Sequence, residues 1–174
     1  MKRPAHLAPT RRLALASLAG FTLAGCGFKL RSSQNFAFTS IAVLPHPGGP
    51  LALELRRSLG GSVQVLAPAA PLAQAQVVLD ILQEQREKTV SGVNSSGQVR
   101  EFQLRIRVKF RLRTPEGKEL VPDAEIVQQR GISYSETAAL AKEAEEALLY
   151  RDMQTDIVQQ LLRRLASIRY ATGP

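Results

Sequence analysis

One stretch of this chain, from Val99 to Arg113, limits the possible folds more than any other part of the sequence. Apolar and polar side chains alternate there almost without interruption. The apolar set is Phe102, Leu104, Ile106, Val108, Phe110 and Leu112, and the set between and after them is Gln103, Arg105, Arg107, Lys109, Arg111 and Arg113. Side chains alternate between two faces only in a β-strand. The stretch therefore predicts a long strand with one buried face and one basic face.

Turn-forming residues lie on both sides of this strand. Ser91–Gly97 is rich in glycine, serine and asparagine, and Thr114–Gly117 contains a proline and a glycine. Two further strand-like runs, Gln76–Lys88 and Leu120–Gly131, lie beyond these turns. Tight turns join antiparallel strands, so we predict a three-stranded antiparallel meander with one face buried and the other in water.

The remaining elements complete the prediction of an α+β domain. Ser40–Leu44 is typical of a short buried strand. Leu51–Leu59 has the apolar spacing of a helix, and Pro50 can occupy its first turn. From Glu143 onward, large apolar residues recur at every fourth position: Leu149, Met153, Ile157, Leu161 and Leu165. We predict a four-stranded, mostly antiparallel sheet with one short and one long C-terminal helix packed on one face.

The N-terminal 25 residues have the organisation of an export signal. Four basic residues precede an apolar run, Leu13–Leu23, that is shorter than the ~20 residues needed to span a bilayer. Leu23-Ala24-Gly25-Cys26 then resembles the bacterial lipobox. We predict that Cys26 is the lipid-bearing first residue of the mature protein, with an S-diacylglycerol and an N-acyl group, although a lone cysteine can also be a buried thiol.

This interpretation divides the chain into four parts. They are a lipoprotein signal peptide (1–25), a lipidated tether (26–39), a single domain (40–170) and a frayed tail (171–174). Gly27 stands where an aspartate would favour retention in the inner membrane, so we expect a lipid anchor on the periplasmic side of the outer membrane. Removing four basic residues lowers the formal net charge from +8 to 8 − 4 = +4. Export makes nucleic acid an improbable partner, and lipopolysaccharide is the anionic polymer of that compartment.

The start of the mature chain carries a family resemblance. Cys26-Gly27-Phe28-Lys29-Leu30-Arg31 is close to the Cys-Gly-Phe/Trp-x-Leu-Arg opening of the lipopolysaccharide-assembly lipoprotein family, LptE. Weaker matches are Gly97-Gln98, Ala139-Leu140-Ala141-Lys142 and Ser167-Ile168-Arg169, and together they extend the resemblance to about Tyr170. It implies a non-enzymatic protein with this same fold. Such proteins sit inside the outer-membrane β-barrel LptD, as a plug needed for its assembly, and bind lipopolysaccharide in transit to the cell surface.

The resemblance also implies binding residues. Basic side chains near the β-turn and before the last helix contact lipopolysaccharide in the family, and Lys142 falls on the second position. At the first, the family's arginine falls at about Ser95, so the match fails there. Arg100, at the end of the same loop, is the candidate that supplies this charge.

The basic face of the central strand allows two interpretations. Side chains two apart on a strand lie about 7 Å apart, so its five cations repel one another unless partners are near. They can pair with Asp123 and Glu125 on one neighbour and with Glu84 or Glu87 on the other. Alternatively Arg105, Arg107 and Lys109 belong to a docking face for lipid A phosphates or for acidic groups of the barrel wall. The acidic neighbours are fewer than the cations, which leaves some charge unpaired.

An enzyme is not expected. The mature chain has His46 as its one histidine and no free thiol, and no glycine-rich phosphate loop precedes a helix. We predict no catalytic residue, no metal site and no cofactor beyond the lipid on Cys26. The alternative function is that of an auxiliary lipoprotein of an envelope lipid-transport ABC system. A peptidoglycan-binding anchor is disfavoured, because the chain has no tryptophan and three tyrosines for stacking on sugars.

Overall fold

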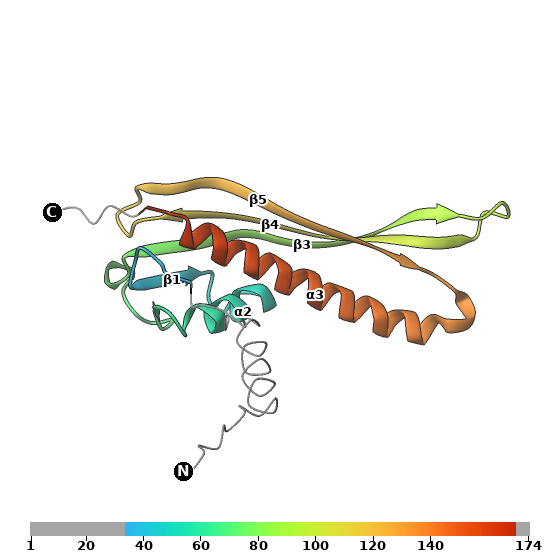
Figure 1. Cartoon of the computed structure of the whole chain (residues 1–174), viewed down its shortest axis with the longest axis horizontal. Helices are drawn as coiled ribbons and strands as arrows, with labels where there is room; N and C mark the ends of the chain where they lie inside the picture. The colour runs from blue at the N-terminus through green and yellow to red at the C-terminus, as the bar shows by residue number, and fades with distance from the viewer. Residues whose placement is uncertain (1–33, 170–174) are drawn as a thin grey trace, which may run out of the picture. The chain divides into compact units, whose positions relative to one another are not determined.

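A computed structural model gives the structure of the chain and describes residues 34–169. One mixed sheet has the strand order β2–β1–β3–β4–β5 (Figure 1). Its strands are β1 (Ser40–Leu44), β2 (Gln64–Val65), β3 (Val77–Val93), β4 (Val99–Arg113) and β5 (Glu119–Ser133). The helices are α2 (Pro50–Leu59) and α3 (Ala139–Ala166), with short 3-10 turns η2 (Leu72–Gln74) and η3 (Glu136–Ala138). The predicted α+β class is confirmed.

The three long strands form the antiparallel meander predicted from their alternation. In β4 every second residue from Leu104 to Leu112 is buried, and Val108 pairs with Ile126 of β5. Gly97 and Gly117 stand in the two connecting turns with φ of 77° and 98°. That left-handed backbone is open to glycine at little cost and strained for most other residues.

A bulge in β3 changes which of its residues face the helices. The register shifts between Ile81 and Gln83, so that Ile81 opposes Phe110 of the core but Glu84 opposes Val108. Directly opposed residues share a face of the sheet. Between the bulge and Val90, the β3 residues on the helix side are therefore charged: Glu84, Arg86 and Lys88. The outer half of β3 thus gives the helices charged groups in place of an apolar surface.

The strand that follows the N-terminal segment lies inside the sheet. β1 pairs in parallel with both β2 and β3. Where the chain enters this strand, the Thr39 N–H donates to Gln76 Oε1 at 2.7 Å and the Gln76 N–H donates to Ser40 Oγ at 3.0 Å. The start of β1 is therefore fastened to the start of β3.

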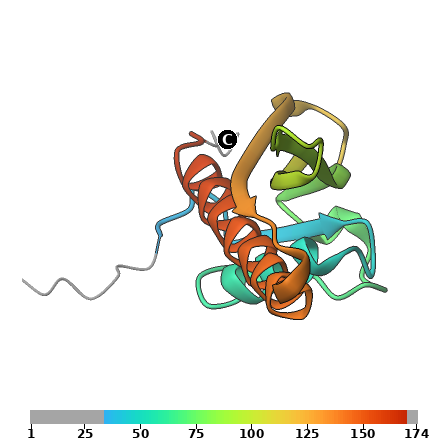
Figure 2. The ribbon, with the colours of Figure 1, turned by 90° about the vertical axis from the view of Figure 1, so that its right-hand side faces the viewer.

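Both helices pack on one face of the sheet, as predicted (Figures 1 and 2). They share a single core with apolar side chains of β1, β3, β4 and β5. Within α3 the buried residues are Met153, Gln154, Ile157, Val158, Leu161, Leu162 and Leu165. All of them lie from Met153 onward, whereas Leu140 and Leu148 are 83% and 55% exposed. The first half of α3 therefore contributes little to the core.

Three sequence-based expectations need correction. The sheet has five strands and not four, because the two residues of β2 add a parallel pairing that is too short to produce an alternating pattern. β3 continues into the predicted turn Ser91–Gly97, since cross-strand pairing persists through bulges as far as Val93. α3 starts at Ala139 and not at Glu143, because its first turn is helical without carrying part of the apolar stripe.

Several predictions lie outside the described residues. They concern the signal peptide (1–25), Cys26, the opening motif 26–31, most of the tether (26–39) and the tail (171–174). Within residues 34–169, no helix combines the length and apolar character needed to cross a membrane.

Candidate functional site

A hollow of about 200 Å³ opens between the outer part of the meander and the first turns of α3. We call it the α3 hollow; its walls are Lys88, Phe102, Ile132, Ser133, Tyr134, Ala139, Lys142, Glu143 and Glu146. The helix contributes only alanine and charged side chains to these walls, so no large apolar group fills the space against the sheet. The hollow therefore exists because the first turns of α3 turn alanine and charged side chains toward the sheet, whereas the buried side chains of α3 start at Met153.

Two lysines from different elements line the α3 hollow. The Lys142 ammonium donates to Ser133 Oγ and to Glu145 Oε2, both at 2.8 Å, and its side chain is 23% exposed. The Lys88 ammonium donates to Glu146 Oε2 at 2.6 Å and lies 4.4 Å from the centre of the Phe102 ring. Both cations are thus held by carboxylates of α3 while facing open space.

The other wall of the hollow is apolar and aromatic. Phe102 meets Tyr134 edge to face, with ring centres 5.3 Å apart and an angle of 80° between the planes. Ile132 is buried beside them. Cationic donors next to an apolar wall suit a ligand that carries both anionic and hydrocarbon groups.

A shallower groove of about 470 Å³ adjoins the hollow and shares Lys88, Glu143 and Glu146 with it. Its other walls are Arg86, Ala147 and Tyr150. The Arg86 guanidinium lies 5.5 Å from the centre of the Tyr150 ring and donates to Gln154 Oε1 at 2.8 Å. Desolvation raises the pKa of the Tyr150 hydroxyl, with Glu146 adding to the effect, and that hydroxyl donates to the Glu87 carbonyl at 2.8 Å.

Of the residues predicted to bind lipopolysaccharide, Lys142 lies in the α3 hollow and Arg100 lies beside it. Arg100 lines a separate hollow of about 220 Å³ with Gln98, Val99, Ser135, Glu136 and Thr137. Tyr134, which lines the α3 hollow, donates its N–H to the Arg100 carbonyl at 2.8 Å. Lys88 was missed, because only the bulge in β3 places it on the side of α3.

The other three candidates, Arg105, Arg107 and Lys109, lie on the opposite face of the sheet. We call this face, with Arg111 and Arg113, the outer basic face. Arg105 pairs with Glu87 at 3.8 Å and Arg107 with Glu125 at 3.7 Å. Among the described residues, Lys109 has no carboxylate within 4.0 Å and is thus the one unpaired cation of this face. Of the two predicted partners on β3, Glu84 or Glu87, the one that pairs with this face is Glu87. The bulge turns Glu84 toward the helices, where it approaches Arg86 at 3.9 Å.

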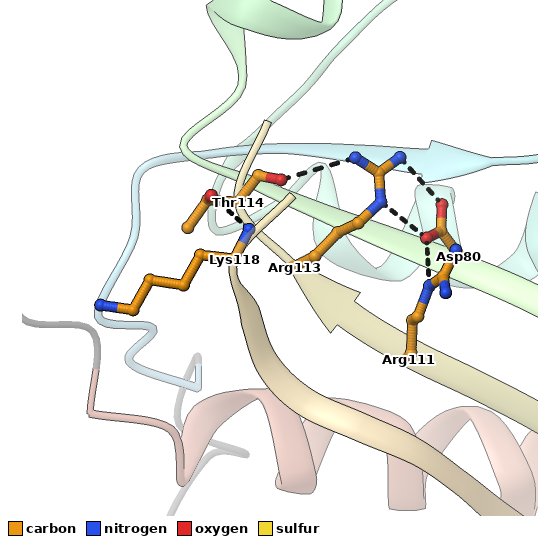
Figure 3. A network of polar contacts seen from close by, with 5 residues as sticks. All are labelled: Asp80, Arg111, Arg113, Thr114 and Lys118. Atoms are coloured by element: carbon orange, nitrogen blue, oxygen red, sulfur yellow. Dashed lines mark hydrogen bonds and ion pairs between the residues drawn. The ribbon is translucent and has the colours of Figure 1, made fainter. Parts of the chain in front are cut away.

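Asp80 holds the two remaining arginines of the outer basic face (Figure 3). Its side chain is 11% exposed and accepts hydrogen bonds from Arg111 Nε at 2.9 Å and from Arg113 Nε at 2.8 Å. Sequence reasoning missed this carboxylate, although an aspartate inside the apolar run Val77–Leu82 signals a buried partner. Four of the five cations of the face are therefore paired, but with only three carboxylates on β3 and β5, because Asp80 is shared by two arginines.

The two hollows and the outer basic face supply charged and polar groups that suit binding. Between residues 34 and 169, no three His, Cys, Asp or Glu side chains are grouped closely enough to hold a metal ion. Desolvation, followed by the nearby Arg56, lowers the pKa of the His46 imidazole, which lies in the loop between β1 and α2.

Comparison with known proteins gives consistent matches. A family model described as "LptE: Lipopolysaccharide-assembly" matches residues 32–165. The chain is 29% identical over 160 residues to proteins named LPS-assembly lipoprotein LptE from Yersinia pestis (strain Pestoides F) and Yersinia pseudotuberculosis serotype O:1b (strain IP 31758), covering 90% of this chain and 76% of each relative.

Solved structures match the same region. The solution structure of the uncharacterized lipoprotein B from Nitrosomonas europaea has a TM-score of 0.70 and 33% identity, over 81% of this chain and 91% of that one. The crystal structure of the rare lipoprotein B from Shewanella oneidensis shares the fold, with a TM-score of 0.62 and 24% identity, over 74% of this chain and 95% of that one.

Proposed function

Because this chain belongs to the LptE family of lipopolysaccharide-assembly lipoproteins, we propose that it plugs and helps to assemble an LptD-type outer-membrane β-barrel and binds lipopolysaccharide on its way to the cell surface. The observation that carries this proposal is the family match from residue 32 to residue 165, which spans nearly the whole described domain. The protein acts by binding, without catalysis.

The α3 hollow supports the proposal that lipopolysaccharide is bound. Lipopolysaccharide combines phosphates and acidic sugars with acyl chains, and the hollow sets Lys142 and Lys88 beside the apolar wall of Phe102 and Ile132. Lysine binds phosphate as a point charge through up to three N–H donors. We assign Lys142 as the principal contact, with Arg100 at the neighbouring hollow as an outlying one.

A binding titration tests this assignment. The full chain, processed in a bacterial host and extracted in detergent, is titrated with labelled lipopolysaccharide. Lys142→Asp is expected to weaken binding roughly tenfold, the effect of losing one charge-assisted contact, with little change in thermal unfolding. Lys118→Asp in the exposed β4–β5 turn is the matched control. Equal affinities for the wild type and Lys142→Asp contradict the assignment.

The barrel partner is tested by a pull-down. A C-terminally tagged chain is captured from detergent-extracted outer membranes and run on gels with and without boiling. We expect a stoichiometric large partner whose mobility shifts on heating, as that of a folded β-barrel does. Capture of inner-membrane transporter subunits instead favours the alternative, an auxiliary lipoprotein of a lipid-transport ABC system.

We further propose that residues 1–25 direct export and that Cys26, bearing its diacylglycerol and N-acyl groups, anchors the protein to the periplasmic side of the outer membrane. Several acyl chains anchor stably, whereas one gives only marginal binding. Residues 26–39 then form the tether of a single domain at 40–170, and 171–174 form a frayed tail. The sequence Cys26-Gly27 supports sorting to the outer membrane.

A further inference from the structure

We propose that Lys88 is a second anion-binding residue of the α3 hollow, and that Glu146 holds it in the free protein until a phosphate of lipopolysaccharide takes its place. This assignment rests on the function proposed above, because it concerns the same site. It adds a ligand residue and a competing carboxylate that the family resemblance does not supply.

Lys88 lies on β3 but faces the same hollow as Lys142. The β3 bulge puts Lys88 opposite Leu104, on the side of the sheet that faces α3. It lines the α3 hollow together with Lys142, which comes from α3 itself. Two ammonium groups on different elements, facing one space, can donate to different oxygens of one phosphate. A single carboxylate has fewer oxygens to offer them.

The present partner of Lys88 is replaceable. Its ammonium binds Glu146 at 2.6 Å, but the two side chains are 37% and 22% exposed. Ion pairs that water reaches are worth at most about 1 kcal/mol. A phosphate carries up to two negative charges and three acceptor oxygens, so it competes well with one carboxylate. The centre of the Phe102 ring lies 4.4 Å from the Lys88 ammonium, and this cation–π contact stabilises the charge of Lys88 while its anionic partner changes.

After displacement, the Glu146 carboxylate can pair with a second cation, Arg86. Glu146 lines both the α3 hollow and the adjoining groove, and that groove also contains the Arg86 guanidinium. A rotation of the Glu146 side chain therefore exchanges one cation, Lys88, for another, Arg86, while the backbone of α3 stays in place. The exchange leaves both lysines of the hollow free for the ligand, provided that Glu145 also releases Lys142.

Two substitutions with opposite expected effects test this proposal, in the lipopolysaccharide titration with the full processed chain. Lys88→Gln is expected to weaken binding roughly tenfold, equivalent to about 1.4 kcal/mol. Glu146→Gln is expected to strengthen binding roughly threefold, because it frees Lys88 in advance. If the Lys88–Glu146 pair only stabilised the fold, the two substitutions would not change the affinity for lipopolysaccharide in opposite directions.

Control variants distinguish a specific loss of binding from the effects of a changed net charge or of an unstable fold. Asp156→Asn releases Arg130 from a comparable ion pair at 3.1 Å and changes the net charge as Glu146→Gln does, so its affinity should equal that of the wild type. Lys88→Arg keeps the cation and should retain binding. Thermal unfolding of each variant identifies any loss of affinity that comes from an unstable fold. If Lys88→Gln proves unstable, the affinities of Glu146→Gln and Lys88→Arg decide the test.

The outcomes distinguish this proposal from the proposed function. A wild type that does not bind lipopolysaccharide overturns both. Binding that falls in Lys142→Asp but is unchanged in Lys88→Gln and Glu146→Gln overturns only the role of Lys88. Weaker binding by Glu146→Gln overturns the exchange. Lipopolysaccharide stripped of its lipid phosphates should bind wild type and Lys88→Gln alike; a persisting difference excludes phosphate as the group that Lys88 recognises.

Discussion

Arg113 contacts both carboxylate oxygens of Asp80: its Nε donates to Oδ2 at 2.8 Å and its Nη2 donates to Oδ1 at 3.4 Å. Arg111 adds a third bond at 2.9 Å. Desolvation alone raises the pKa of the Asp80 carboxyl, but the hydrogen bonds and charges of the two arginines outweigh it and lower that pKa below the usual value. One carboxylate on β3 therefore fastens the end of β4 that lies farthest from the α3 hollow.

Replacing Asp80 by Asn should lower the free energy of unfolding by about 2 kcal/mol at neutral pH, because two cations lose their charged partner. A carboxyl whose folded-state pKa is lowered contributes stability above its unfolded-state pKa of about 3.9, and the contribution is lost as pH falls through the folded-state value. Urea unfolding of wild type and Asp80→Asn should thus differ at pH 7 and converge in acid below that range. Asp152→Asn, on the exposed surface of α3, serves as control, and a difference that does not depend on pH contradicts this account.

The two halves of α3 should respond differently to loss of a leucine. Leu161 is fully buried, so Leu161→Ala should cost about 3 kcal/mol through lost burial and a cavity. Leu148 is largely exposed, and Leu148→Ala should cost less than about 0.5 kcal/mol. Chemical denaturation of both variants measures this, and similar losses would mean that the first half of α3 is packed more tightly than its exposure indicates.

Changes of charge on the outer basic face should separate structural pairing from partner recognition. Lys109→Gln removes an unpaired cation without placing a carboxylate opposite Glu125, the residue across from it on β5. It should therefore leave thermal unfolding unchanged while lowering the yield of barrel in the pull-down or the affinity for lipopolysaccharide. Arg107→Glu also breaks the pair with Glu125 and should cost about 0.5 kcal/mol of stability. If neither variant alters barrel capture or lipopolysaccharide affinity, this face is only paired and solvated.

Replacing Cys26 by Ala should release a folded periplasmic protein. Without a thiol the chain cannot receive its diacylglycerol, and no other membrane anchor is predicted. Cell fractionation with an unprocessed and a processed size marker measures this. A product that stays in the membrane fraction after salt washing contradicts the tether.

Patterns within single elements could be read from the sequence. The alternation of Val99–Arg113 is enough to define β4 to the residue, and the leucine stripe of α3 is buried from Met153 to Leu165 as its spacing predicts. Lys142 lines the α3 hollow, and its contact with lipopolysaccharide stays a prediction. These features depend on local periodicity or on direct comparison of short motifs.

Features that depend on how strands are aligned could not be read in the same way. One extra residue at Leu82 decides that Glu84 and Lys88 face the helices and that Glu87 faces Arg105. The pattern of β3 becomes polar there, so no apolar signal marks the change of face. The role of Asp80 was missed for a similar reason, since the partners lie more than 30 residues away on β4.

The position of β1 has a mechanical consequence. A membrane anchor at the N-terminus would pull on the domain where the chain enters β1 at Ser40. β1 has parallel neighbours on both sides, and the side chain of Gln76 binds the chain at Thr39. A load along this strand strains its backbone hydrogen bonds together in shear, whereas a strand at the border of a sheet can be peeled away bond by bond. Tension on such an anchor would thus reach the sheet at a strand that has a neighbour on each side.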